Sequence, residues 1–197
     1  MGVSRIMPLS KIQSESINLA DNFAFTGTVT GAGVSGKVLQ LVSVSMDNAL
    51  SISSSSTSNF LDVTGLVASI TPSATGSKVL VMVSTTLHHS AAYIIHVNVE
   101  RTISGTATKL GTANVSNRVG SVMSTLPVNS YYGVSMFPVS FQLIDSPNTT
   151  SACSYQVQVT LGAHYSGTIY VNRTNNDNDA DYASRTKSTI TLMEIGA

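Results

Sequence analysis

Residues 154–161, SYQVQVTL, alternate polar and apolar side chains over their whole length. A side-chain period of two places every apolar member on one face of a strand, so this stretch predicts a half-buried β-strand. The same alternation runs through residues 95–100 and 139–143. Residues 79–83, VLVMV, are apolar at every position, which is typical of a strand covered on both faces.

Further β-rich stretches follow one another along the rest of the chain. We expect strands at residues 39–44, 60–63, 67–71, 169–171 and 189–195. Clusters of Gly, Pro, Asn, Asp and Ser predict turns between strands, at residues 62–65, 72–76, 104–105 and 146–148. No stretch of a dozen residues has a helical period. The sequence therefore predicts an all-β fold: an antiparallel β-sandwich, jelly-roll-like, or a barrel.

The composition excludes several classes of protein. Among 197 residues, 10 Lys and Arg balance 10 Asp and Glu, and charged residues make up 10%, against roughly 25% in an average soluble domain. Polarity comes instead from 31 Ser and 22 Thr. A chain without basic excess lacks the electrostatic footprint of a nucleic-acid binder. The 42% of hydrophobic residues can form a core, which excludes a disordered tail.

The sequence also bounds the compartment. Its apolar runs reach about five residues, too few for a membrane span or the core of a signal peptide, so we expect a soluble protein that does not insert into membranes. Cys153 is the single cysteine and cannot form an internal disulfide, which suits assembly in a reducing cytosol.

The chain divides near Gly36. Residues 23–36, FAFTGTVTGAGVSG, are dense in glycine and read as a linker. We therefore expect an extended N-terminal segment over residues 1–36 and a β-sandwich domain over residues 37–197. The Thr-Gly alternation of the linker could also add a short strand to a neighbouring chain.

Three motifs come close to known sites. Residues 31–37, GAGVSGK, nearly form a phosphate-binding loop, but Val38 replaces the hydroxyl residue that holds Mg²⁺ and a strand follows instead of a helix. Asp177, Asp179 and Asp181 alternate like the first half of a calcium loop, without its turn glycine; a solvated Asn/Asp loop is the alternative. Four histidines could include two metal ligands, although no spacing fixes their geometry: His88, His89, His96 and His164. We expect no metal site and no cofactor.

Catalytic motifs are equally sparse. The chain holds three glutamates and no G-x-S-x-G elbow, and a paired-carboxylate hydrolase would need acidic residues from separate strands to meet in a cleft. We therefore expect no enzyme. Tyr131 and Tyr132 lie among small polar residues between two strands, as contact tyrosines do, or they pack across the sandwich. His88 and His89 are the other candidates for a receptor-contact face, as neutral hydrogen-bonding groups.

Three stretches together resemble tail-fibre-like virion proteins of tailed bacteriophages, especially phages of marine bacteria. They are residues 11–33, which contain INLADNFAFTGTVTG; residues 58–81, which begin SNFLDVTGL; and residues 168–195, which begin TIYVNR and end STITLMEI. The resemblance covers most of the chain, and the first stretch is an adaptor shared by otherwise different fibres. These segments carry no catalytic motif.

The resemblance implies a virion structural protein, assembled in the host cytoplasm, with an N-terminal segment docked on other proteins of the tail, neck or head. The docking candidates are apolar: Ile17, Leu19, Phe23 and Phe25. The outer β-rich domain would be homotrimeric and would adhere to a host surface glycan or protein. Two alternatives remain open: a capsid or tail decoration protein without a receptor, and a polysaccharide depolymerase.

Overall fold

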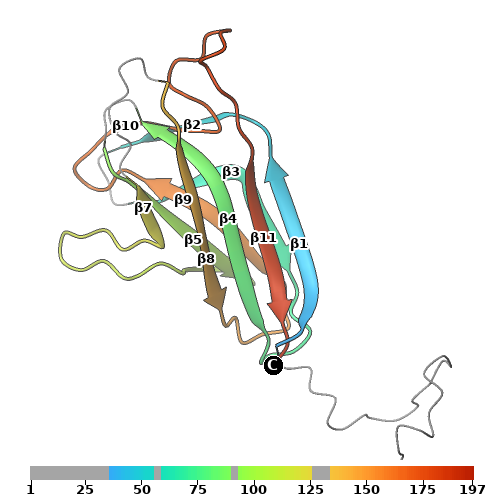
Figure 1. Cartoon of the computed structure of the whole chain (residues 1–197). Helices are drawn as coiled ribbons and strands as arrows, with labels where there is room; N and C mark the ends of the chain where they lie inside the picture. Colours follow the sequence, from blue (N-terminus) through green and yellow to red (C-terminus); the bar gives the residue numbers. More distant parts are fainter. Residues whose placement is uncertain (1–35, 56–58, 90–92, 126–133) are drawn as a thin grey trace, which may run out of the picture. The chain divides into compact units, whose positions relative to one another are not determined.

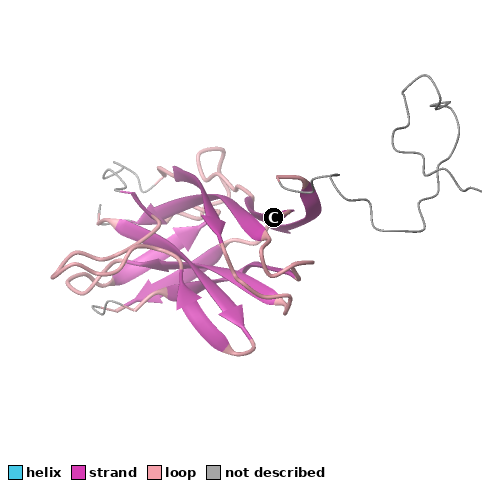
Figure 2. Ribbon diagram, turned by 90° about the horizontal axis from the view of Figure 1, so that it is seen from below, coloured by secondary structure: helices cyan, strands magenta, loops and turns pink. Residues whose placement is uncertain are grey.

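The computed structural model describes residues 36–55, 59–89, 93–125 and 134–197. Their regular structure consists of β-strands without a helix (Figure 2). The strands are β1 (Val38–Met46), β2 (Leu50–Ser54), β3 (Leu61–Ile70), β4 (Lys78–His89), β5 (Ile95–Ile103), β6 (Thr106–Lys109), β7 (Met123–Thr125), β8 (Phe137–Asp145), β9 (Cys153–Thr160), β10 (Gly167–Val171) and β11 (Ser188–Ile195). The all-β prediction is confirmed.

The strands form two antiparallel sheets that face each other (Figure 1). The six-stranded sheet has the order β1-β11-β4-β10-β2, with β8 on the other edge of β4. The five-stranded sheet has the order β3-β9-β5-β6, and β7 also pairs with β5. The predicted sandwich is therefore confirmed, and the alternative of a closed barrel is not what the described strands form.

Three pairs of strands each occupy a single strand position in their sheet: β1 with β2, β10 with β11, and β6 with β7. β10 and β11 pair with successive parts of the same edge of β4, and β2 and β1 pair with them in turn. β6 and β7 likewise share one edge of β5. Joining each pair leaves eight strands in the orders β1-β11-β4-β8 and β3-β9-β5-β6, which is the arrangement of a jelly roll.

Valine and other aliphatic side chains fill most of the space between the sheets. Val81 and Leu192 of the six-stranded sheet are fully buried, as are Val97 and Val157 of the five-stranded sheet. Each alternates with side chains on the outer face, as the two-residue period requires. Full burial of such a side chain is worth about 1.5–3 kcal/mol, so this double layer dominates the stability of the sandwich.

One predicted turn is wrong. Residues 62–65 do not separate two strands; they lie inside β3, where the pairing with β9 shifts between Asp62 and Val67. Gly65 has a φ of +92°, a conformation open to glycine that lets the strand accommodate an irregularity. The predicted turn at Ser104–Gly105 does connect β5 to β6, with φ values of +48° and +82°.

The chain enters and leaves the sandwich at the same end, which we call the proximal end. The Gly36 N–H donates to the Gly196 carbonyl (2.9 Å), and the Gly196 N–H donates to the Lys37 carbonyl (2.8 Å). The segment between β10 and β11, residues 172–187, lies at the opposite, distal end (Figure 1). Residues 1–35 are outside the described part of the chain, so the docking segment remains a prediction.

Candidate receptor-contact groove

A finger of residues 110–122 projects between β6 and β7. Both of its ends bond to β5: the Leu110 N–H donates to the Val99 carbonyl and the Val122 N–H to the Val97 carbonyl, each at 2.9 Å. At its tip, Val115 and Arg118 exchange backbone hydrogen bonds of 3.1 and 3.0 Å. The finger is therefore a short hairpin anchored at both ends on a core strand.

Two glycines allow the finger to close on itself. A Cβ at Gly111 would lie 2.6 Å from Oδ1 of Asn98, the atom that accepts the Gly111 N–H at 2.8 Å. A Cβ at Gly120 would collide with the carbonyl oxygen of Thr112 on the opposite arm. Any side chain at these positions would force the two arms apart, so the glycines fix where the tip lies.

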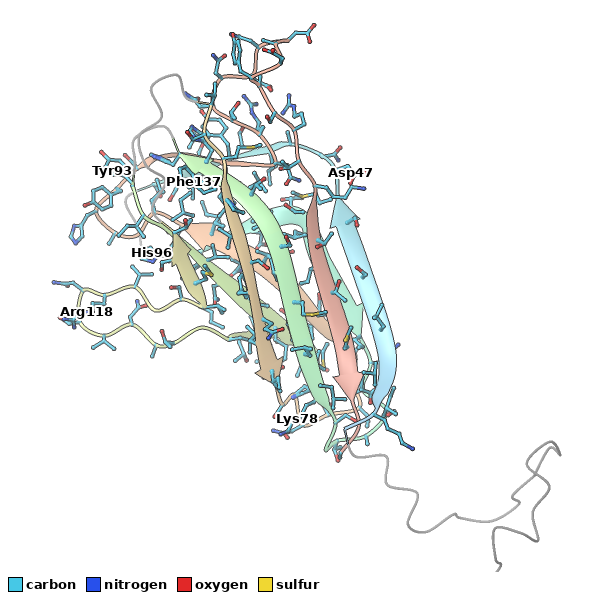
Figure 3. All side chains as sticks on the ribbon, in the orientation of Figure 1. Asp47, Lys78, Tyr93, His96, Arg118 and Phe137 are labelled. Atoms are coloured by element: carbon cyan, nitrogen blue, oxygen red, sulfur yellow. The ribbon has the colours of Figure 1, made fainter. Side chains whose placement is uncertain are left out.

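A groove of about 260 Å³ separates the finger tip from the segment that follows β9. It continues into a smaller hollow of about 90 Å³ on the same finger. Three parts of the chain supply the polar side chains, namely His96 from β5, Asn117 and Arg118 from the finger, and His164 and Tyr165 after β9. Figure 3 shows Tyr93, His96 and Arg118 on one side of the sandwich.

The chemistry of the groove is that of hydrogen bonding, one fixed positive charge and one exposed aromatic ring. Nδ1 of His96 lies 2.8 Å from Oγ of Ser124, and burial lowers the pKa of His96, so its imidazole is neutral at pH 7. Arg118 is exposed, and it forms no ion pair within the described residues. Tyr165 is 42% exposed and stacks on Tyr93, with ring centroids 4.3 Å apart.

Such a set can bind a ligand but offers little for catalysis. Guanidinium, imidazole and amide groups hydrogen-bond hydroxyls and carboxylates, and a fixed tyrosine ring offers a flat apolar contact. The described lining contains no Asp or Glu. The paired carboxylates of a polysaccharide hydrolase are therefore not found in this groove.

The predicted contact residues His88 and His89 are not on a surface. Their exposed fractions are 1% and 2%, because they end the central strand β4, with β8 and β10 on its two edges. The His88 Nδ1 lies 2.5 Å from the Ser135 carbonyl, and the His89 ring lies 5.3 Å from that of Tyr93. Burial lowers the pKa of both imidazoles, so they are neutral structural groups. The expectation that they form a contact face is wrong for this fold.

The other predicted site residues fall outside the described part of the chain. Tyr131 and Tyr132 belong to residues 126–133, and the docking candidates Ile17, Leu19, Phe23 and Phe25 belong to residues 1–35. Their roles remain predictions. The sequence patterns did not predict the groove. Gly111 and Gly120, which flank a short polar segment, are the signal in the sequence that could have indicated a closed hairpin.

The acidic segment at the distal end is built around ion pairs. Asp177 pairs with Arg173, at 3.1 Å between Nη1 and Oδ2, and also with Arg185. Nowhere in the described ranges do three or more His, Cys, Asp or Glu side chains gather as a metal site. The Asp177 carboxylate is thus engaged by two arginines, which favours the solvated-loop interpretation over calcium.

Asn172 anchors this segment where it leaves β10. Its side chain is fully buried, donates to the carbonyls of Met46 (2.8 Å) and Asn48 (3.2 Å), and accepts from the Ser188 hydroxyl (2.6 Å). Its φ is +59°, which asparagine tolerates better than most residues. The side chain therefore ties the β1–β2 junction to both ends of the distal segment.

No family model and no curated protein matches the chain. Solved structures that match the chain include a VP2 point variant of infectious bursal disease virus in T=1 particles, at 12% identity and a TM-score of 0.40, covering 80% of this chain and 36% of that one. The T13 particle of the same virus gives 14% identity and a TM-score of 0.40, with 91% and 41% covered. Its Gt strain gives 12% and 0.35, with 95% and 47% covered. The chain spans less than half the length of each of these neighbours.

No helix in the described ranges is long and apolar enough to cross a membrane.

Proposed function

We propose that the chain is a virion structural protein: a fibre subunit that docks on the particle through residues 1–36 and presents the sandwich outward for adhesion. The sequence resemblance to phage tail-fibre-like proteins supports this proposal. One structural observation carries it: the hydrogen bonds of Gly196 with Gly36 and Lys37 hold the start of the described chain at the proximal end, opposite residues 172–187.

The groove lies in the half of the sandwich away from the proximal end. β8 ends near the proximal end, where Asp145 pairs with Val79, and β9 begins there at Cys153. His96 pairs with Thr160, at the other end of β9. A particle attached through the proximal end would leave the groove accessible to a host surface. We propose that it contacts a surface glycan, through Arg118, His164 and the ring of Tyr165. Weak single sites would gain strength from many copies on one particle.

Deleting residues 1–36 tests the docking role. We expect the full chain to be incorporated into particles and the chain of residues 37–197 to be absent from them, although it accumulates in folded form in the infected cell. Incorporation of the truncated chain at the level of the full chain would show that docking uses another surface.

Binding of the purified full chain to host cells tests adhesion. Arg118→Ala and Tyr165→Ala should each weaken binding by about tenfold or more, which corresponds to about 1.4 kcal/mol. Lys37→Ala is the matched control, since Lys37 is an exposed cation at the proximal end. If the full chain does not bind cells while it is present in particles, the protein is a decoration protein without a receptor.

A further inference from the structure

The outer face of the six-stranded sheet carries almost no charge. Its outward side chains alternate with the buried core residues along β1, β4, β8 and β11. They are Leu41, Ser43, Ser45, Leu80, Met82, Ser84, Thr86, Pro138, Ser140, Gln142, Ile144, Thr189, Thr191, Met193 and Ile195. Charge lies at its margins: Lys78, the first residue of β4, is at the proximal end, and the ion pair between Lys187 and Asp47 lies just beyond the last paired residues of β11 and β1 at the distal end. We call this surface the uncharged face.

The outer face of the other sheet is a contrast within the same molecule. Asp62, Glu100 and Lys109 all belong to it, as their pairing with neighbouring strands shows. Charged side chains on an outer sheet face keep it in water, and the cores of protein interfaces are depleted in them. The absence of charge from one face only therefore marks that face as a contact surface.

Strand register aligns the apolar residues of the uncharged face in a row. Leu41 pairs with Met193, Met193 with Leu80, and Leu80 with Ile144. Ile144 is 61% exposed and Leu41 is 55% exposed. Because paired residues on one face of a sheet are direct neighbours, these four side chains form a continuous ridge across four strands. We call it the apolar ridge.

A hollow lies directly beside the ridge. It has a volume of about 420 Å³, and its lining includes Met82, Ser84, Ser140, Gln142, Thr189 and Thr191. Small hydroxyl side chains flank the longer Met82 and Gln142, which is why the surface is depressed there. The Met82 side chain and the methyl groups of Thr189 and Thr191 offer the lining apolar contact area for a ridge, and the hydroxyls beside them can donate or accept hydrogen bonds.

The edge of the sheet next to the ridge is also open. β1 pairs with β11 alone among the described strands, and Val38 and Leu39 on it are 58% and 44% exposed. Residues 38–46 contain no charge and no proline. In monomeric proteins, charged residues or proline usually protect an exposed edge strand from pairing with another chain. An edge strand without them is a site of association.

We propose that the uncharged face is the contact between copies of this chain, with the apolar ridge of one copy seated in the hollow of the next. The ridge and the hollow lie side by side on one surface, so each copy offers both halves of the contact. A face without charge meets its own copy without repulsion, whereas a charged partner would leave its charges unpaired there. The inference rests on the proposed function, because it names the self-contact of the fibre subunit.

Sedimentation equilibrium of the full chain tests the proposal. At micromolar concentration we expect a mass that is a multiple of 20.6 kDa. Ile144→Lys and Ser84→Arg, which place a charge on the ridge and in the hollow, should each raise the dissociation constant by about 100-fold or more. Val67→Lys is the matched control, since Val67 is exposed on the outer face of the five-stranded sheet, and it should leave the mass unchanged.

A monomeric wild-type chain would overturn the proposal, as would variants of the uncharged face that keep the wild-type mass. Dissociation by Val67→Lys as strongly as by Ile144→Lys would also overturn it. Ile144 and Ser84 are exposed, so we expect the variants to stay folded, with an unchanged urea midpoint for each.

Cysteine cross-linking gives a second, independent test. The single native cysteine, Cys153, is buried, so new surface thiols report alone. The double variant Ile144→Cys with Ser84→Cys should form a covalent oligomer under mild oxidation, and Val67→Cys should not. Absence of cross-linking would refute the ridge-in-hollow contact. Loss of the full chain from virions would instead refute the proposed function, so the two failures are distinguishable.

Discussion

The replacement of Asn172 by alanine is the sharpest test of how the distal end is held. The substitution removes two donors, to the carbonyls of Met46 and Asn48, and the acceptor of the Ser188 hydroxyl. A buried polar group left unsatisfied costs about 1–3 kcal/mol. The Ser188 hydroxyl keeps the Thr85 hydroxyl as a partner at 2.8 Å, so we count the Met46 carbonyl alone, at about 1–3 kcal/mol.

Backbone conformation adds to this cost. Residue 172 has a φ of +59°, and an alanine there meets a steric penalty of about 1–2 kcal/mol. We therefore expect Asn172→Ala to lower the free energy of unfolding by about 2–5 kcal/mol, a substantial share of the 5–15 kcal/mol of a typical domain. Asn172→Gly loses the same hydrogen bonds without the steric penalty, so it should cost about 1–2 kcal/mol less.

Urea denaturation of the full chain measures both variants. Protein concentration must be held constant, since association of copies would stabilise the folded state. A cost below about 1 kcal/mol for Asn172→Ala would refute the assignment of this side chain as the anchor. Equal costs for alanine and glycine would refute the contribution of the left-handed backbone.

Three further predictions concern the buried ionic groups and the association of copies. Asp145→Ala leaves Arg101 and the buried Tyr155 hydroxyl, both at 2.8 Å from its carboxylate, without their partner, and should cost about 3–5 kcal/mol in urea denaturation; a cost under 1 kcal/mol would contradict it. Burial alone would raise the pKa of Glu194, but the hydrogen bonds that its carboxylate accepts from the Ser73 hydroxyl and N–H together outweigh this and lower the pKa. A carboxyl whose pKa is lower in the folded than in the unfolded state stabilises the fold above the unfolded-state pKa, and this stabilisation is lost as pH falls through the folded-state pKa. The free energy of unfolding of the wild type should therefore decline from about pH 5 to about pH 3 more steeply than that of Glu194→Gln. Parallel curves would contradict this. The oligomer mass should stay constant from low to high salt, since the uncharged face has no ion pairs to screen; dissociation in high salt, followed by light scattering, would show an ionic contact instead.

The alternation in residues 154–161 predicted β9 because a strand with one face packed on the core needs an apolar side chain at every second residue. This requirement is visible within the strand itself. Val157 and Val159 are buried, as the pattern requires. Residues 62–65 misled the prediction because a strand irregularity and a turn use the same residue types, and only the pairing of β3 with β9 distinguishes them. Burial of His88 and His89 depends on neighbouring strands and on Tyr93 from a separate segment, which no local pattern reveals.

The two surfaces differ in how far the sequence could reveal them. A charged fraction of 10% predicts a surface that is poor in charge, but the location of the uncharged face depends on the register of four strands. The groove combines β5, the finger and the segment after β9. Those parts lie far apart in the sequence, so their meeting could not be read from it.

A density map of the whole virion tests the central claim most directly. We predict copies of the sandwich on the outside of the particle, with Gly36 and the C-terminus toward the particle and residues 172–187 pointing away from it. Residues 1–36 should contact another virion protein in the same map. A particle without the sandwich, or one that holds it with residues 172–187 toward the particle, would contradict the account.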